Sequence, residues 1–86
     1  MKITEKENIT EVVAYKVDLL TTDEIRMDLL YDNGSIITIS EEDQDWDWNI
    51  SNLKSLYRFN SEWEKSVVLP PFEMNRTIVY RRMMEK

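Results

Sequence analysis

The feature that most constrains the fold of this chain is a β-hairpin sequence that turns at Asp32-Asn33-Gly34. Gly34 is the only glycine in the chain, and glycine readily adopts the left-handed backbone conformation that tight hairpin turns require. Apolar and polar residues alternate on both sides of the turn, as they do in strands with one buried face. The segment therefore predicts two antiparallel strands, residues 25–31 and 35–40.

The register of this hairpin follows from which side chains share a face. A two-residue turn at Asn33-Gly34 would mix charged and apolar side chains on both faces. A three-residue turn, with Gly34 in the left-handed position, pairs Leu29 with Ile37 and Tyr31 with Ser35. Because a slip of one residue moves every side chain to the opposite face, the three-residue turn is predicted. It leaves Leu30 and Ile36 as apolar exceptions on the polar face and gathers the other apolar residues on one face: Ile25, Met27, Leu29, Ile37 and Ile39.

Two further strands are predicted nearer the ends of the chain. Residues 9–20 alternate with period two, and their β-branched and aromatic content favours a strand over a helix. Residues 76–82 predict a final strand, which we expect to lie antiparallel beside the first. The larger alternating side chains of the first strand predict its half-buried face: Val13, Tyr15, Val17 and Leu19.

One main helix is predicted over residues 46–59, with Asp45 or Asp47 capping its N-terminus. Residues 62–66 predict another helical turn, with Trp63 pointing inward. The stripe expected to cover the sheet consists of apolar residues at helical spacing: Ile50, Leu53, Leu56 and Tyr57. The predicted fold class is α+β, an antiparallel β-meander (β-β-β-α-β) with one helix packed across one face of the sheet.

The 86 residues predict a single domain, with residues 1–8 frayed. Pro70-Pro71 is interpreted as an extended strut within this domain rather than as a flexible linker. The N-terminus lacks the apolar core of a signal peptide, and no apolar run is long enough to span a bilayer. We therefore expect a cytoplasmic protein without membrane association. The absence of cysteine is compatible with a reducing compartment.

The net charge of −6 is unevenly distributed along the chain. Residues 1–50 carry thirteen acidic and four basic side chains, a balance of −9, whereas residues 51–86 carry four acidic and seven basic ones. An acidic surface repels phosphate backbones, so nucleic acid is disfavoured as a partner. A basic protein is the natural complement, because opposite fields accelerate the encounter and fix its orientation. The simpler interpretation is that the acidic excess only confers solubility.

The residue types that most enzymes use are missing, since the chain has no histidine and no cysteine. Triads built on either residue are excluded, and a Gly-rich phosphate loop cannot be formed with one glycine. We predict neither enzymatic activity nor a cofactor.

A calcium loop is the one metal site that the sequence suggests. Asp43, Asp45 and Asp47 alternate like the start of an EF-hand loop. However, Trp48 stands where the loop needs glycine, and Lys54 stands where a glutamate should close the site. We therefore predict no metal site.

The acidic, tryptophan-bearing segment of residues 41–48 is the candidate partner-binding surface. On a helix Trp46 and Trp48 point about 200° apart, so one of them is expected to face solvent. An exposed tryptophan among carboxylates is typical of a protein-interface hot spot, although core packing and a solvated helix N-terminus are the structural alternatives. The predicted site consists of Glu41, Glu42, Asp43, Asp45, Trp46, Asp47 and Trp48.

Two resemblances bear on function. Residues 63–81 have a spine of Trp63, Val67, Pro70, Phe72, Asn75, Thr77 and Tyr80, and they resemble the endings of small uncharacterised bacterial proteins. In size, acidity and lack of catalytic groups, the whole chain resembles bacterial immunity proteins, which neutralise a cognate toxin by binding it. The resemblance implies occlusion of the active site of a basic toxin, often a nuclease, by acidic side chains around a tryptophan anchor.

Two alternative functions follow from other parts of the chain. The basic C-terminal strand, with Arg76, Arg81 and Arg82, is compatible with a small regulatory or nucleic-acid-associated module. Ion pairs between these arginines and the acidic first half are a structural explanation for the same residues. A homo-oligomer that uses an exposed sheet edge is the other alternative.

Overall fold

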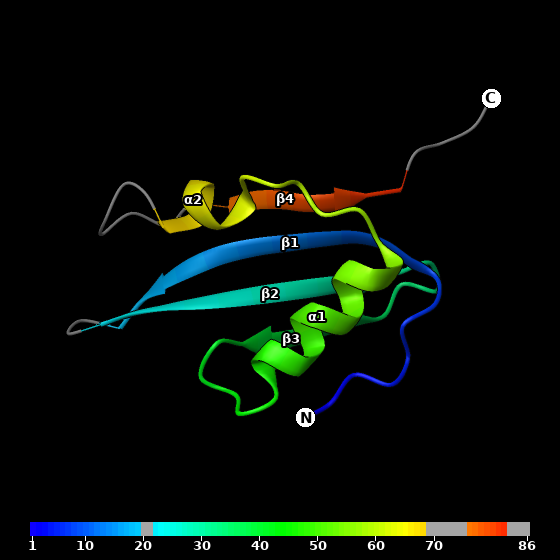
Figure 1. Ribbon diagram of the computed structural model, residues 1–86, viewed down its shortest axis with the longest axis horizontal. Helices are drawn as coiled ribbons and strands as arrows, with labels where there is room; N and C mark the ends of the chain where they lie inside the picture. The colour runs from blue at the N-terminus through cyan, green and yellow to red at the C-terminus, as the bar shows by residue number, and fades with distance from the viewer. Residues whose placement is uncertain (20–21, 69–75, 83–86) are drawn as a thin grey trace.

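The structure, a computed structural model, describes residues 1–19, 22–68 and 76–82. Its elements follow in the order β1 (Ile9–Asp18), β2 (Asp23–Tyr31), β3 (Ile36–Ser40), α1 (Trp46–Leu56), α2 (Trp63–Val68) and β4 (Arg76–Arg81). The strands form one antiparallel sheet with the order β3-β2-β1-β4, and both helices lie against the same face of it (Figure 1). The α+β prediction is confirmed, including the position of the last strand beside the first. Pro70, Phe72 and Asn75 lie outside the described residues, as do the end of the predicted first strand and the last four residues.

The hairpin adopts the three-residue turn. Leu29 pairs with Ile37 and Met27 with Ile39, and the N–H of Tyr31 donates to the carbonyl of Ser35 at 2.9 Å. Gly34 has a φ of +92°, in the left-handed region that glycine tolerates best. The predicted register is therefore confirmed.

The packing face of β1 is the opposite of the predicted one. Val12 pairs with Leu29 and Ala14 with Met27, and these residues form the core under the helices. Val13 is also buried but lies on the other face, paired with Ile78 of β4. Strand β1 is central in the sheet, so its neighbours cover side chains on both faces. Alternation alone therefore did not show which face the helices cover.

Lys16 shares the helix-facing side of β1. Its side chain is 5% exposed, and its ammonium lies 3.8 Å from the carboxylate of Asp23. The long aliphatic stem of lysine packs well among apolar groups while its charged end reaches a partner.

Helix α1 is shorter than predicted and is rotated relative to the predicted stripe. Its inward residues are Trp46, Asn49, Ile50 and Leu53, at the i, i+3, i+4 and i+7 positions. Leu56 is 56% exposed, so its assignment to the core was wrong. The helix ends at Leu56 because Tyr57 has an extended backbone, with φ −127° and ψ 145°. Tyr57 then packs against Tyr80 of β4, with ring centroids 4.7 Å apart and ring planes tilted by 53°.

Helix α2 and strand β4 lie where the sequence predicted a helical turn and a final strand. Trp63 begins α2 and is 3% exposed, as the predicted inward orientation requires. Neither described helix has the length and hydropathy needed to cross a bilayer.

Residues 1–8, which we call the N-terminal strap and for which fraying was predicted, lie against the rest of the domain. Ile3 is 3% exposed, and the strap runs beside α1 at one end of the sheet (Figure 1). No partner was predicted for this polar segment, but the hydrogen bonds described below hold it in place.

The rotation of α1 predicts different costs for two leucine truncations. Leu53→Ala removes a fully buried side chain and is expected to lower the free energy of unfolding by about 2–5 kcal/mol. Leu56→Ala is the matched control at an exposed position, with an expected change within about 0.5 kcal/mol. Urea denaturation followed by circular dichroism measures both. Equal losses would contradict the orientation of α1.

Candidate partner-binding surface

The turn that connects β3 to α1, residues 41–45, is fixed by its own acidic side chains. Glu41 accepts a hydrogen bond from the backbone N–H of Ile25 at 2.8 Å, and its own N–H donates to the Ile25 carbonyl at 3.0 Å. Asp43 accepts from the N–H of Ser40 at 3.2 Å. Glu41 therefore continues the hydrogen bonding of the hairpin beyond the end of β3, and Asp43 binds the outward N–H of Ser40.

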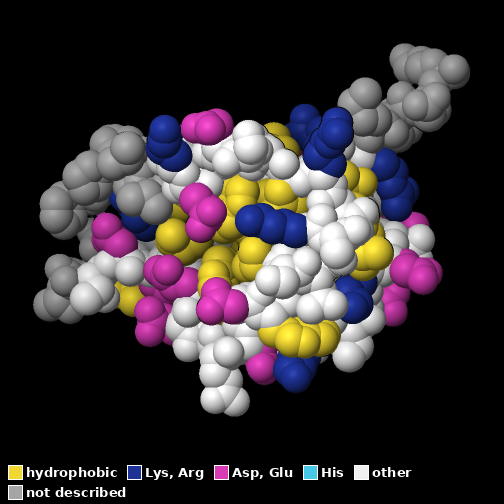
Figure 2. Space-filling model, in the orientation of Figure 1, with side chains coloured by type: hydrophobic (Ala, Val, Ile, Leu, Met, Phe, Trp, Pro, Cys, Tyr) yellow, Lys and Arg dark blue, Asp and Glu magenta, His cyan; other side chains and the backbone are white. Residues whose placement is uncertain are grey.

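The first residues of β2 extend this acidic surface. Glu24 accepts hydrogen bonds from Arg26 and from the hydroxyl of Ser40, and Asp23 precedes it on the same strand. Figure 2 shows acidic side chains gathered at the lower left, over this end of the sheet. Asp23 and Glu24 were missed from sequence, although extending the hairpin register past the Arg26–Ser40 pair would have placed them beside the turn.

Glu24 is held as a carboxylate. The hydrogen bond from Arg26, followed by that from Ser40, holds the pKa of Glu24 below its ordinary value. A carboxyl group with a lowered pKa is a poor proton donor at neutral pH, so it is suited to accepting hydrogen bonds rather than to acid catalysis.

Two of the predicted site residues support the fold. Asp45 stands at the N-terminus of α1, where its side chain makes no capping hydrogen bond. Its carboxylate lies 3.1 Å from the Met1 ammonium instead. Trp46 is partly buried and packs against the core. Of the seven predicted residues, Glu42, Asp47 and Trp48 are the exposed ones.

Trp48 is the outward-facing tryptophan, with 38% of its surface exposed. The ammonium groups of Lys2 and Lys6 lie 5.0 and 5.3 Å from the centroid of its ring. Both distances are typical of cation–π contacts. Two cations from the N-terminal strap therefore lie over the ring of Trp48, where a rim of carboxylates was predicted.

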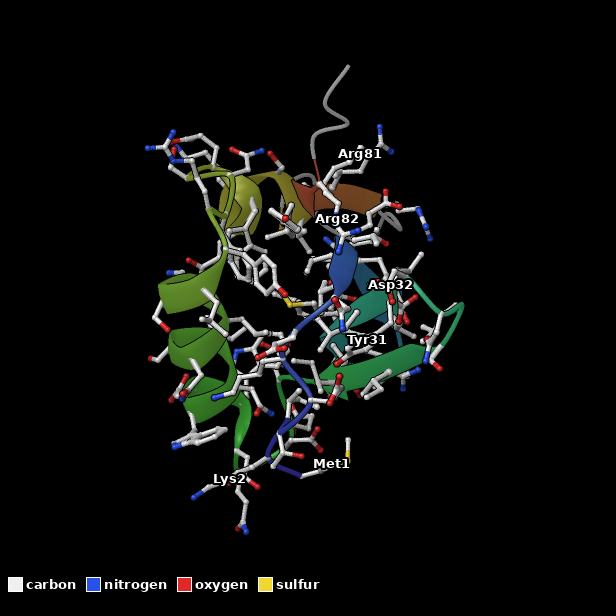
Figure 3. The ribbon with its side chains drawn as sticks, turned by 90° about the vertical axis from the view of Figure 1, so that its right-hand side faces the viewer. Met1, Lys2, Tyr31, Asp32, Arg81 and Arg82 are labelled. Atoms are coloured by element: carbon white, nitrogen blue, oxygen red, sulfur yellow. The ribbon has the colours of Figure 1, made fainter. Side chains whose placement is uncertain are left out.

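The strap owes its position to a buried amide in α1. Asn49 is fully buried; its Oδ1 accepts from the N–H of Ile3 at 2.8 Å, and its Nδ2 donates to the carbonyl of Met1 at 2.9 Å. The hydroxyl of Tyr31 donates to the carbonyl of Glu5 at 2.6 Å. Figure 3 shows Met1 and Lys2 beside the first turn of α1. An asparagine at an inward helix position was the sequence signal for this docking.

The basic C-terminal strand is partly neutralised. Arg81 lies 3.0 Å from Glu11 of β1, as the ion-pair interpretation predicted, and Figure 3 shows Arg81 and Arg82 at the far end of the molecule from Lys2. Arg76 and Arg82 are exposed.

The acidic turn does not form a cation cage. Within the described ranges, no group of three or more Asp or Glu side chains is arranged to hold a metal ion. The carboxylates of Glu41, Asp43 and Asp45 are directed instead at backbone N–H groups and the Met1 ammonium.

Comparisons of the chain with protein-family models, curated proteins and solved structures find no match. The function is therefore argued from the surface just described.

The lowered pKa of Glu24 predicts how stability depends on pH. Its ionised form is favoured in the folded state, so its contribution is present above about pH 4.5 and is lost as the pH falls through the lower folded pKa. The melting temperature of Glu24→Gln should fall below that of the wild type at pH 6, and the gap should close toward pH 3. Glu64→Gln, at an exposed position on α2, is the control. A gap that stays constant with pH would refute this role.

The contacts of Asn49 predict that its truncation releases the strap. Asn49→Ala leaves the buried N–H of Ile3 without a partner, at a cost of about 1–3 kcal/mol in unfolding free energy. Hydrogen exchange of the Ile3 amide, measured by NMR, should accelerate more than that of the β1 amides. Ser51→Ala, at an exposed position of α1, is expected to leave Ile3 protected. Unchanged protection in Asn49→Ala would show that other contacts hold the strap.

Proposed function

We propose that this protein binds a basic protein partner through the acidic end of its sheet. The observation that carries the proposal is the fixed turn of residues 41–45. Glu41 and Asp43 are engaged with the backbone N–H groups of Ile25 and Ser40, whereas Glu42 and Asp47 remain exposed. A fixed turn loses little conformational entropy when a partner binds, which favours affinity.

The chemistry of this surface supports binding rather than catalysis. The chain has no histidine or cysteine, and the pKa of Glu24 is lowered rather than raised toward neutrality. Carboxylates that stay ionised are suited to pairing with the lysine and arginine side chains of another protein.

Trp48 supplies an aromatic anchor next to these charges. The ammonium groups of Lys2 and Lys6 lie at cation–π distance from its ring, so the ring is a suitable contact for a cationic group. A cationic side chain of the partner would take the place of one of these lysines, with Asp47 on the same helix turn adding a charge of opposite sign.

The specific form that we propose is an immunity protein that neutralises a basic bacterial toxin, such as a nuclease. Its mechanism would be occlusion: the exposed carboxylates pair with cationic residues that otherwise hold substrate phosphates. The small size, the net charge of −6 and the absence of histidine and cysteine support this form.

The proposal predicts a loss of binding on charge reversal. The double variant Glu42→Lys/Asp47→Lys should bind the captured partner at least about tenfold more weakly than the wild type, with a reduced salt dependence. Glu62→Lys/Glu64→Lys makes the same change in net charge at exposed positions near α2 and should bind normally. Affinity capture from the native cell with mass spectrometry identifies the partner, and titration calorimetry measures the dissociation constants.

The proposal that the partner is a toxin requires one further experiment. Expression of the captured partner alone should arrest growth, and co-expression of the wild-type protein should restore it while the double variant should not. Capture of nucleic acid in place of a protein, lost on reversal of Arg76 and Arg82, would contradict the proposal.

A further inference from the structure

The two outer edges of the sheet differ in their cover. The segment between α1 and α2 runs alongside β4 (Figure 1), and the N–H of Asn60 donates to the Val79 carbonyl at 2.8 Å. At the outer edge of β3, the backbone hydrogen bonds found in the described ranges involve Ser40, whose N–H and carbonyl are bound by Asp43. Strand β3 therefore presents an open edge.

The hairpin register identifies the groups on this edge. The N–H of Tyr31 donates to Ser35 at one end of the hairpin, and that of Glu41 donates to Ile25 at the other. Hydrogen-bonded pairs alternate along an antiparallel ladder, so Ile37 and Ile39 point their backbone groups toward β2. The N–H and C=O groups of Ile36 and Thr38 consequently point away from the sheet.

The sequence of β3 makes this edge a good template for another strand. Its residues Ile-Ile-Thr-Ile-Ser have high β-propensity and contain none of the lysine or proline residues that usually block edges. The side chain of Ile36 is 59% exposed, and Thr38 is also exposed.

Both ends of the edge are acidic. Exposed Glu42 follows β3 in the fixed turn, and exposed Asp32 precedes β3 in the hairpin turn. Beside Asp32 lies a hollow of about 210 Å³ lined by Glu5, Tyr31 and Ile37 among others. One water occupies roughly 30 Å³, so the hollow has room for the end of a lysine or arginine side chain.

These charges favour a strand with basic ends over a second copy of β3 as the occupant of the edge. In an antiparallel pair of two β3 strands, Glu42 of each copy would lie near Asp32 of the other, and like charges directly opposed are destabilising. A strand with basic residues at both ends meets opposite charges instead.

We propose that β3 receives an extended segment of the basic partner as a fifth strand of the sheet. Backbone hydrogen bonds to Ile36 and Thr38 hold the segment, as in other cases of strand addition. One of its basic side chains enters the hollow beside Asp32 and Glu5, and another pairs with Glu42. This inference rests on the proposed function and adds the mode of binding.

The edge is tested with a proline variant and a matched control. Ile36→Pro removes an outward N–H at the first residue of an edge strand, a position where proline is tolerated. Ile36→Val keeps the N–H and the β-branched side chain. We expect the partner to bind Ile36→Pro at least about tenfold more weakly, and Ile36→Val as tightly as the wild type. Equal binding to both variants would overturn the inference.

A probe peptide makes the test independent of the proline variant. The probe alternates threonine and valine and carries a pair of lysines at each end. In NMR titration of the wild-type protein, it should shift the amide signals of Ile36 and Thr38 and slow their hydrogen exchange. The same peptide with glutamates at its ends should not. Absence of these shifts with the basic probe, or retention of binding by a backbone N-methylated probe, would overturn strand addition.

The two proposals fail separately. Partner binding lost in Glu42→Lys/Asp47→Lys but unchanged in Ile36→Pro would remove strand addition and leave the acidic surface in place. Sedimentation that shows a wild-type dimer, converted to monomer by Ile36→Pro, would identify β3 as an interface between copies of this chain and would overturn the proposed occupant.

Discussion

The register of the β2–β3 hairpin controls the rest of this molecule. With Leu29 opposite Ile37 and Met27 opposite Ile39, these four apolar side chains face the helices. The same pairing puts Asp28 and Thr38 together on the other face, where the Thr38 hydroxyl donates to Asp28 at 2.7 Å. It also carries the chain beyond Ser40 in contact with the start of β2. A shift of one residue would exchange the two faces and separate the acidic turn from Ile25.

The buried amide of Asn49 orients helix α1 as the hairpin register orients the faces of the sheet. A buried asparagine is unfavourable unless both ends of its amide are hydrogen-bonded, and the strap supplies an N–H to one end and a carbonyl to the other. Asn49 therefore sets the rotation of α1. Because Trp48 is adjacent to Asn49, this rotation turns Trp48 outward and brings it within reach of Lys2 and Lys6.

A feature of the fold could be predicted from sequence where a local pattern determines it. The hairpin could be predicted because Gly34 limits the turn and the two registers sort charged and apolar residues differently. The helix stripe could not, because Leu56 has the right spacing for the core while Asn49, which is buried, has the wrong polarity. Which face of β1 packs under the helices depends on the neighbours of a central strand, and one of them, β4, is distant in sequence.

The same distinction between local pattern and long-range pairing applies to the residues of the candidate site. Glu42, Asp47 and Trp48 were predicted and are exposed, because solvated carboxylates at the start of a helix are a local feature. The contributions of Asp23 and Glu24 depend on strand pairing, and the contact of Asp45 with the Met1 ammonium depends on the docking of the strap. Charge composition alone did not distinguish the carboxylates that hold the turn from those that face solvent.

The repulsion among the carboxylates at this end of the sheet explains that division of roles. Five acidic side chains surround the junction of β2, β3 and the turn: Asp23, Glu24, Glu41, Glu42 and Asp43. Their mutual repulsion is offset where backbone N–H groups, Arg26 or Lys16 lie against them. Glu42 remains exposed, and it is the second residue after the end of the edge strand β3. A single basic segment aligned on β3 would therefore reach both the open backbone groups and this carboxylate, so that charge and strand pairing would select the same partner.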